Sequence, residues 1–128
     1  MSLIFAMATK SSKMAGLWGK LFWRDFKIMT DNTLIIIAVL KAREGQREAL
    51  KSALKELIEP THQEPGCLDY AIFQLQEEPD TFYVRESWRG QEALDAHIGL
   101  PHFQHFVSAM DSLLAVPLKL VPLIPVKA

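Results

Sequence analysis

The hydrophobic positions change their period along the chain, and each change predicts a new element of secondary structure. Residues 33–40 form a near-continuous apolar and β-branched run, which is typical of a strand in the centre of a sheet. From Gln46 to Ile58, apolar residues recur every three or four positions with charged residues between them, which predicts a helix with one buried face. Pro60 should end or kink this helix, and Glu64-Pro65-Gly66 should form a turn.

The remainder of the chain predicts a hairpin, a broken helix and a last strand. Residues 67–76 and the run that begins near Thr81 predict two strands joined by a polar loop, and therefore pairing antiparallel. Residues 91–98 predict a short helix, and after Gly99 and Pro101 a second helix should run to about Leu114. The proline-containing stretch 118–126 predicts an edge or exchanged strand.

This order of elements predicts a ferredoxin-like βαββαβ sandwich of the α+β class, with helices on one face of an antiparallel sheet. The first strand and the face that carries Phe73 are too apolar to be left in water. We therefore expect the second face of the sheet to be buried in a homodimer.

Residues 1–30 differ from the rest of the chain in charge. They hold five basic residues and one acidic residue, for a charge of +4, and the total of −1 leaves −5 on residues 31–128. Five apolar side chains in this segment have the spacing of an amphipathic helix, namely Met14, Leu17, Trp18, Leu21 and Phe22. We interpret residues 1–30 as an appendage to a domain at 31–128, in preference to a segment that contacts a membrane surface.

Composition excludes several classes of protein. The single cysteine, Cys67, rules out an intrachain disulfide and a cysteine-based metal site, and it suits the reducing cytoplasm, where we expect the protein. No apolar run approaches the roughly 20 residues that span a bilayer. No basic patch interleaves with aromatic residues, so we expect no nucleic-acid partner.

The strand near residues 82–88 carries a carboxylate on an otherwise apolar face. Alternate residues of a strand share a face, and this face consists of Phe82, Val84, Glu86 and Trp88. An ionised carboxylate is costly on a buried face unless it is paired. His97 lies on the inner stripe of the following helix, so we expect it to be the partner of Glu86.

The pair of Glu86 and His97 fits two interpretations. In the first, the two groups transfer protons for a reaction, because a histidine changes its protonation state near neutral pH. In the second, they form a buried hydrogen bond that holds the helix to the sheet. His102 begins the last helix and would close the mouth of a pocket. His102 and His105 have a spacing that could hold a metal ion, but no carboxylate accompanies them in the motif, so we expect no metal.

Four short motifs in this order resemble the antibiotic biosynthesis monooxygenase domain, over about residues 33–125. They are Glu64-Pro65-Gly66-Cys67-Leu68-x-Tyr70, Phe82-Tyr83-Val84-x-Glu86-x-Trp88, Leu94-x-x-His97 and Pro101-His102-Phe103-x-x-Phe106. The resemblance implies a dimeric α+β barrel. It also implies oxidation of a small phenolic or quinol substrate by O₂ without metal, flavin or haem as a cofactor.

On that hypothesis His97 and Glu86 handle protons, and the indole N–H of Trp88 binds an oxygen of the substrate. Tyr70, His102 and Phe82 would complete the substrate site. The family that the chain resembles is functionally mixed, so the fold alone does not determine the reaction. The alternatives are a non-catalytic dimeric ligand-binding protein, an isomerase and a haem-degrading enzyme. The haem-degrading branch is expected to place an asparagine within the first strand, and none stands at 33–40. An isomerase acting on a small phosphorylated or keto substrate would need basic groups at the pocket. Arg85 and Arg89 fall on the strand face opposite Glu86, which disfavours this alternative.

Overall fold

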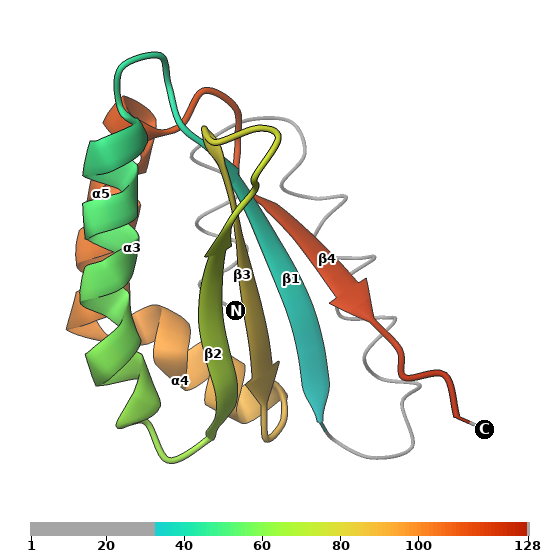
Figure 1. The fold of residues 1–128 in the computed structure, drawn as a ribbon. Coiled ribbons are helices and arrows are strands. Elements are labelled where there is room, and N and C mark those ends of the chain that lie inside the picture. The colour runs from blue at the N-terminus through green and yellow to red at the C-terminus, as the bar shows by residue number, and fades with distance from the viewer. Residues whose placement is uncertain (1–32, 128) are drawn as a thin grey trace.

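The computed structural model describes residues 33–127, and the predicted appendage at 1–30 lies outside the described residues. Four strands form one antiparallel sheet in the order β2-β3-β1-β4. Their bounds are Leu34–Lys41 for β1, Cys67–Gln74 for β2, Thr81–Trp88 for β3 and Lys119–Leu123 for β4. Three helices lie on one side of this sheet, namely α3 (Arg47–His62), α4 (Gln91–Gly99) and α5 (Pro101–Leu113) (Figure 1). The predicted ferredoxin-like α+β architecture is therefore confirmed.

The core lies between the sheet and the helices. Strand β1 is central, between β3 and β4, and its alternate residues Leu34, Ile36, Ala38 and Leu40 are buried beneath the helices. From the other side, α3 contributes the buried residues Leu50, Leu54 and Leu57. The alternation of buried and half-buried residues along β1 shows that only one face of this strand is fully covered within the chain.

Pro60 does not end the helix that contains it. Helix α3 continues to His62, two residues beyond the proline. Proline removes one backbone N–H donor, and in the last turn the helical bonding resumes at once, because the amide of Gln63 donates to the carbonyl of Glu59 at 3.3 Å. Of the two outcomes expected at Pro60, an end or a kink, the end falls two residues later, at His62, and the kink stays a prediction.

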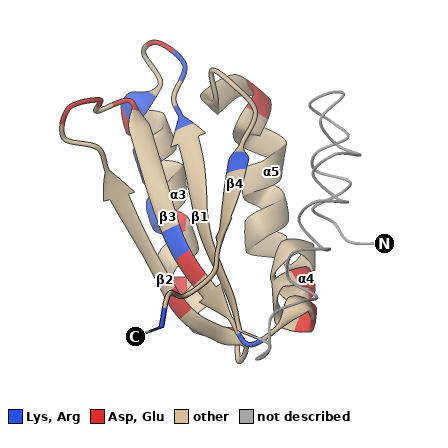
Figure 2. Ribbon diagram, turned by 90° about the vertical axis from the view of Figure 1, so that its right-hand side faces the viewer, with Lys and Arg blue, Asp and Glu red and all other residues tan. Residues whose placement is uncertain are grey.

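The second face of the sheet carries no helix within residues 33–127. Figure 2 shows this face, with the strands in front of α3 and few charged positions along them. Phe73 on β2 and Tyr83 on β3 form a register pair there, and both side chains are exposed. Arg85 bridges this apolar surface, because its guanidinium bonds Asp69 at 2.7 Å and lies 5.2 Å from the centre of the Phe73 ring. The predicted burial of this face in a homodimer stays a prediction.

None of the helices within residues 33–127 has both the length and the apolar character that crossing a membrane requires.

Candidate active site

Glu86 lies in the middle of the sheet, on the face that the helices cover. In the sheet register it stands between Tyr70 of β2 and Ile36 of β1, and it is only 7% exposed. Its Oε1 accepts a hydrogen bond of 2.7 Å from the indole Nε1 of Trp88, which is fully buried two positions further along β3. The period of the strand puts both side chains on one face, so this contact forms within a single element.

His97 is held by Glu64 and not, as the sequence led us to expect, by Glu86. Helix α4 follows β3 directly and folds back over the sheet, which buries His97 to 1% exposure. The Nδ1 atom of His97 lies 2.7 Å from Oε2 of Glu64, in the turn between α3 and β2. Strand β2 starts with Cys67 paired to Trp88, so the turn that carries Glu64 lies beside the end of β3 from which α4 departs.

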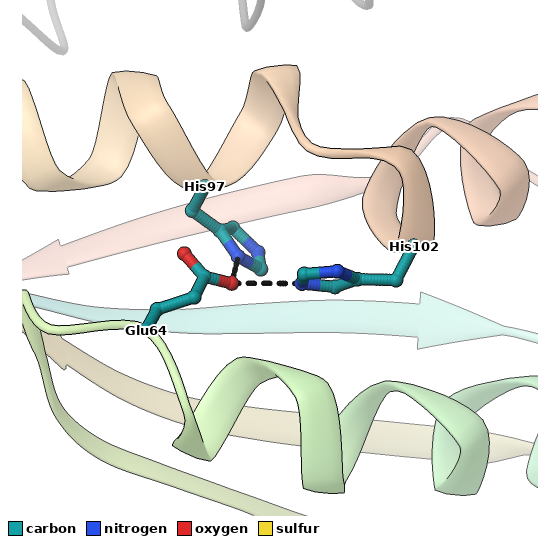
Figure 3. Close-up of side chains that lie close together, drawn as sticks. All are labelled: Glu64, His97 and His102. Atoms are coloured by element: carbon teal, nitrogen blue, oxygen red, sulfur yellow. Dashed lines mark hydrogen bonds and ion pairs between the residues drawn. The ribbon is translucent and has the colours of Figure 1, made fainter.

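His102 joins the same carboxylate from a third element. Its Nε2 atom lies 2.8 Å from Oε2 of Glu64, so one oxygen of Glu64 contacts both imidazoles (Figure 3). An ionised carboxylate can only accept hydrogen bonds, so both rings donate an N–H to it. When the ring of His97 is neutral, its proton is therefore on Nδ1 and its lone pair is on Nε2. Glu64 thus selects the tautomer in which Nε2 of His97 can accept a proton.

Aromatic rings surround the imidazole of His97 and restrict its orientation. The ring centre of Trp88 lies 4.5 Å away, that of Phe103 4.8 Å away and that of Tyr70 6.0 Å away. These are the separations of favourable aromatic contacts. The ring of His97 is therefore fixed by packing as well as by its hydrogen bond.

A cavity of about 30 Å³ lies between the sheet and the helices, beside these polar groups. Tyr70, Glu86 and His97 line it, as do Phe103 and Phe106 of α5. Its volume suffices for a water molecule. Of the predicted site residues, Phe82, Trp88 and His102 do not line the cavity, whose remaining walls are aliphatic: Ile36, Ala38, Leu40, Leu54, Leu57, Val84, Leu94, Ile98, Leu118 and Leu120.

Burial determines the electrostatics of this region. It raises the pKa of Glu86, while the nearby His97 and the hydrogen bond from Trp88 act in the opposite direction. Burial and the carboxylate of Glu86 hold the pKa of the Tyr70 hydroxyl well above its usual range, so this phenol stays protonated. Burial also raises the pKa of the Cys67 thiol to about 11, which leaves it without nucleophilic character at neutral pH.

Glu64 is the central residue that the sequence analysis missed. Its position in the turn Glu64-Pro65-Gly66 suggests only local structure, because no hydrophobic or helical period connects it with His97. The one available signal was its place at the head of the first of the four motifs. Within residues 33–127, the ligand atoms of Glu64, His97 and His102 form a cluster with all separations below 4.8 Å, which also makes it a candidate metal site.

Fold and site together define a small α+β protein with a hydrogen-bonded cluster of one carboxylate and two imidazoles between its sheet and its helices. The chain belongs to the antibiotic biosynthesis monooxygenase family, whose sequence model matches residues 33–109. The resemblance inferred from the four motifs is thereby confirmed.

Relatives of the chain include proteins with and without a named activity. It is 31% identical over 88 residues to the Bacillus subtilis protein named "Putative monooxygenase YcnE", covering 69% of this chain and 93% of that protein. It is 32% identical over 87 residues to the uncharacterized Synechocystis protein sll1783, and this match covers 68% of the chain but only 59% of that longer relative.

Solved structures support the same fold. The crystal structure of PA3566 from Pseudomonas aeruginosa superposes with a TM-score of 0.72 at 32% sequence identity, over 77% of this chain and 99% of that one. The structure of Rv0793 from Mycobacterium tuberculosis superposes with a TM-score of 0.70 at 29% identity, over 75% and 97% of the two chains.

Proposed function

We propose that the protein is a monooxygenase that oxidises a small phenolic or quinol substrate with O₂, with His97 as the general base. The observation that carries the proposal is the contact of His97 with Glu64, which fixes the imidazole at the wall of a cavity that Glu86 also lines. Membership of the family supports the reaction class. The geometry supports a proton acceptor in a buried setting that aromatic and aliphatic side chains line.

In this proposal Nε2 of His97 takes the proton of a substrate hydroxyl, and Nδ1–H keeps its bond to the carboxylate of Glu64. The resulting phenolate is electron-rich and passes an electron to O₂, which needs no cofactor. A quinol then gains one oxygen atom and becomes a hydroxyquinone, while the second oxygen atom leaves as water. The substrate supplies all the electrons, so no external reductant takes part.

Trp88, Phe82 and Tyr70 contribute to this scheme in different ways. The indole N–H of Trp88 already donates to Glu86, so it is not available to a substrate oxygen as the sequence analysis expected. Trp88 acts instead as a positioning residue for Glu86 and for the ring of His97, from which its own ring lies 4.5 Å. Phe82 is buried on the same face of β3 but does not line the cavity. Tyr70 forms part of the wall that would face the substrate.

The substrate needs more room than the cavity of about 30 Å³ provides. A benzene ring is known to fill an apolar cavity of about 150 Å³. Phe103 is the side chain that would move to make this room, because it lines the cavity and is only half-buried in the first turn of α5. Entry of an aromatic substrate in place of the Phe103 ring keeps an aromatic contact on His97.

We also propose that the protein works as a homodimer formed through the open face of the sheet. The support for this is the apolar row that crosses the strands on that face, with Phe73 47% exposed and Tyr83 39% exposed. A second copy of the chain would cover this row.

The test is oxygen consumption by the purified protein with a panel of hydroquinones, in a buffer that contains a chelator. Turnover above autoxidation is expected, and His97→Ala should abolish it. His105→Ala is the matched control, because His105 is exposed on α5 and outside the cluster. Rates equal to autoxidation across the panel would contradict the proposal for those substrates.

The second candidate function is a non-catalytic protein that holds a small ligand in the same cavity. The oxygen Oε2 of Glu64 favours it, because both imidazoles already pair with this atom and the cluster is accounted for as a hydrogen-bonded network. Tight binding of a hydroquinone without any turnover, equally strong in the wild type and in His97→Ala, would establish this function in place of the first.

A further inference from the structure

We propose that Glu64, His97 and His102 form a binding site for a divalent transition-metal ion of the Zn²⁺ type. The proposal goes beyond the oxidation proposed above and does not depend on it. It rests on the three side chains that Figure 3 shows converging from the turn after α3, from α4 and from the start of α5.

The ligand atoms are close to the separations that a metal ion requires. Nδ1 of His97 and Nε2 of His102 lie 2.7 and 2.8 Å from Oε2 of Glu64, and the three atoms all lie within 4.8 Å of one another. Zinc holds nitrogen and oxygen ligands at about 2.0–2.2 Å in a tetrahedron, so neighbouring ligand atoms are about 3.4 Å apart. The Glu64–His97 and Glu64–His102 pairs would each have to open by about 0.6–0.7 Å to admit the ion.

The donor set specifies the class of metal. Two imidazole nitrogens and one carboxylate oxygen suit zinc and other divalent first-row transition ions, whereas magnesium and calcium prefer oxygen ligands alone. Three protein ligands leave at least one coordination position open, as in zinc sites that bind water or a small ligand.

The electrostatics favour occupation by a cation. Glu64 and Glu86 are both buried, and they are close enough that the charge of Glu64 opposes the ionisation of Glu86. A dication would offset this local negative charge. Metal binding moves the proton of each ring to its other nitrogen, so Nε2 of His97 would no longer accept a proton. The metal-bound state and the use of His97 as a base therefore exclude one another.

The surroundings meet two further requirements of a metal site. The ring of His97 is fixed between Trp88 and Phe103, and Trp88 is in turn fixed by its bond to Glu86, so the ligand is pre-oriented. The side chain of His102 is 21% exposed and borders a groove of about 580 Å³ between α3 and α5, which gives the ion a route from solvent.

The experiment titrates the full chain, stripped with EDTA, with Co²⁺ followed by visible absorption and with Zn²⁺ followed by calorimetry. One ion per chain is expected, with the absorption bands of Co²⁺ in a site of low coordination number. Glu64→Gln and His102→Ala should each weaken binding at least tenfold. His105→Ala, which removes an exposed histidine one turn further along α5, should leave it unchanged.

Circular dichroism of each variant separates loss of the site from loss of the fold. His102 is the most exposed of the three ligands, so His102→Ala decides the question if a change at Glu64 prevents folding. The proposal is overturned if the wild type binds less than one ion per chain, or if His102→Ala binds as tightly as His105→Ala. In either case the cluster is a hydrogen-bonded network only.

Discussion

Glu64 and His97 are 33 residues apart in the chain, and the carboxylate of one lies 2.7 Å from the imidazole of the other in the buried layer between sheet and helices. This contact connects the turn after α3 to helix α4, whose residue His97 lines the cavity. It selects the tautomer of His97, and through the same oxygen it fixes His102 at the start of α5. The site therefore depends on a residue outside the strand and helix that carry the other polar groups.

We expect Glu64→Ala to lower the free energy of unfolding by about 3 kcal/mol, because it leaves the buried His97 without its hydrogen-bond partner. His102→Ala should cost less, since that side chain keeps contact with water. Urea unfolding measures both values. Glu56→Ala, an exposed position on α3, is the control and should stay within about 0.5 kcal/mol of the wild type. Equal free energies of unfolding for Glu64→Ala and Glu56→Ala would show that the cluster contributes nothing to the stability of the fold.

Glu86→Gln should stabilise the protein increasingly as the pH rises. Burial raises the pKa of Glu86 in the folded state above the value of 4.5 that an unburied glutamate has. Below about pH 4.5 the carboxyl is neutral in both states and costs nothing. As the pH rises through the higher folded pKa, the unfolded chain is already ionised, so the native state loses stability relative to it. Glutamine stays neutral and still offers Trp88 an acceptor.

The measurement is the difference in unfolding free energy between wild type and Glu86→Gln, from about pH 4 to about pH 8, in buffer with a chelator. Taking the difference cancels the contribution of groups that do not interact with Glu86, whereas His97, Glu64 and Tyr70 interact with its charge, so the difference reports Glu86 together with these neighbours. Glu77→Gln, an exposed position, controls for the loss of one negative charge. A difference that is constant with pH would mean that Glu86 is not desolvated.

The elements and their order follow from hydrophobic periodicity, and so does the row Phe82, Val84, Glu86 and Trp88. A period of two places alternate residues on one face whatever the tertiary structure, so burial of Glu86 beside Trp88 was predictable. The inward direction of His97 was predictable for the same kind of reason, from its spacing to Leu94.

Partner choice within the buried layer was not predictable by such arguments. Glu86 and Glu64 are both buried carboxylates near His97, and which of them bonds the imidazole depends on how the turn before β2 meets the start of α4. That arrangement follows from the register of β2 against β3, where Cys67 pairs with Trp88, and from a one-residue irregularity between Cys67 and Asp69. Periodicity carries no information on either.

Gly66→Ala tests the fit of this turn against α4. A Cβ atom at position 66 would overlap the Cβ of Ala93, so the substitution should destabilise the fold by about 1–3 kcal/mol. In an Ala93→Gly background the same change should cost less, because the overlapping atom is gone. Unfolding of the four proteins of this double-mutant cycle gives the coupling. Equal costs in both backgrounds would mean that the turn adjusts freely, and that the position of Glu64 is not fixed by packing on α4.

Phe73→Asp tests the proposed homodimer. Phe73 lies on the open face of the sheet and is 47% exposed in the single chain, so a charge there should cost little within the chain but oppose burial against a second copy. Sedimentation or light scattering should give a dimer for the wild type and a monomer for the variant. Val116→Asp is the matched control, since Val116 is 53% exposed in the loop between α5 and β4, outside the strands. If both variants dimerise as the wild type does, association uses another surface, and the apolar row across the sheet has a different partner.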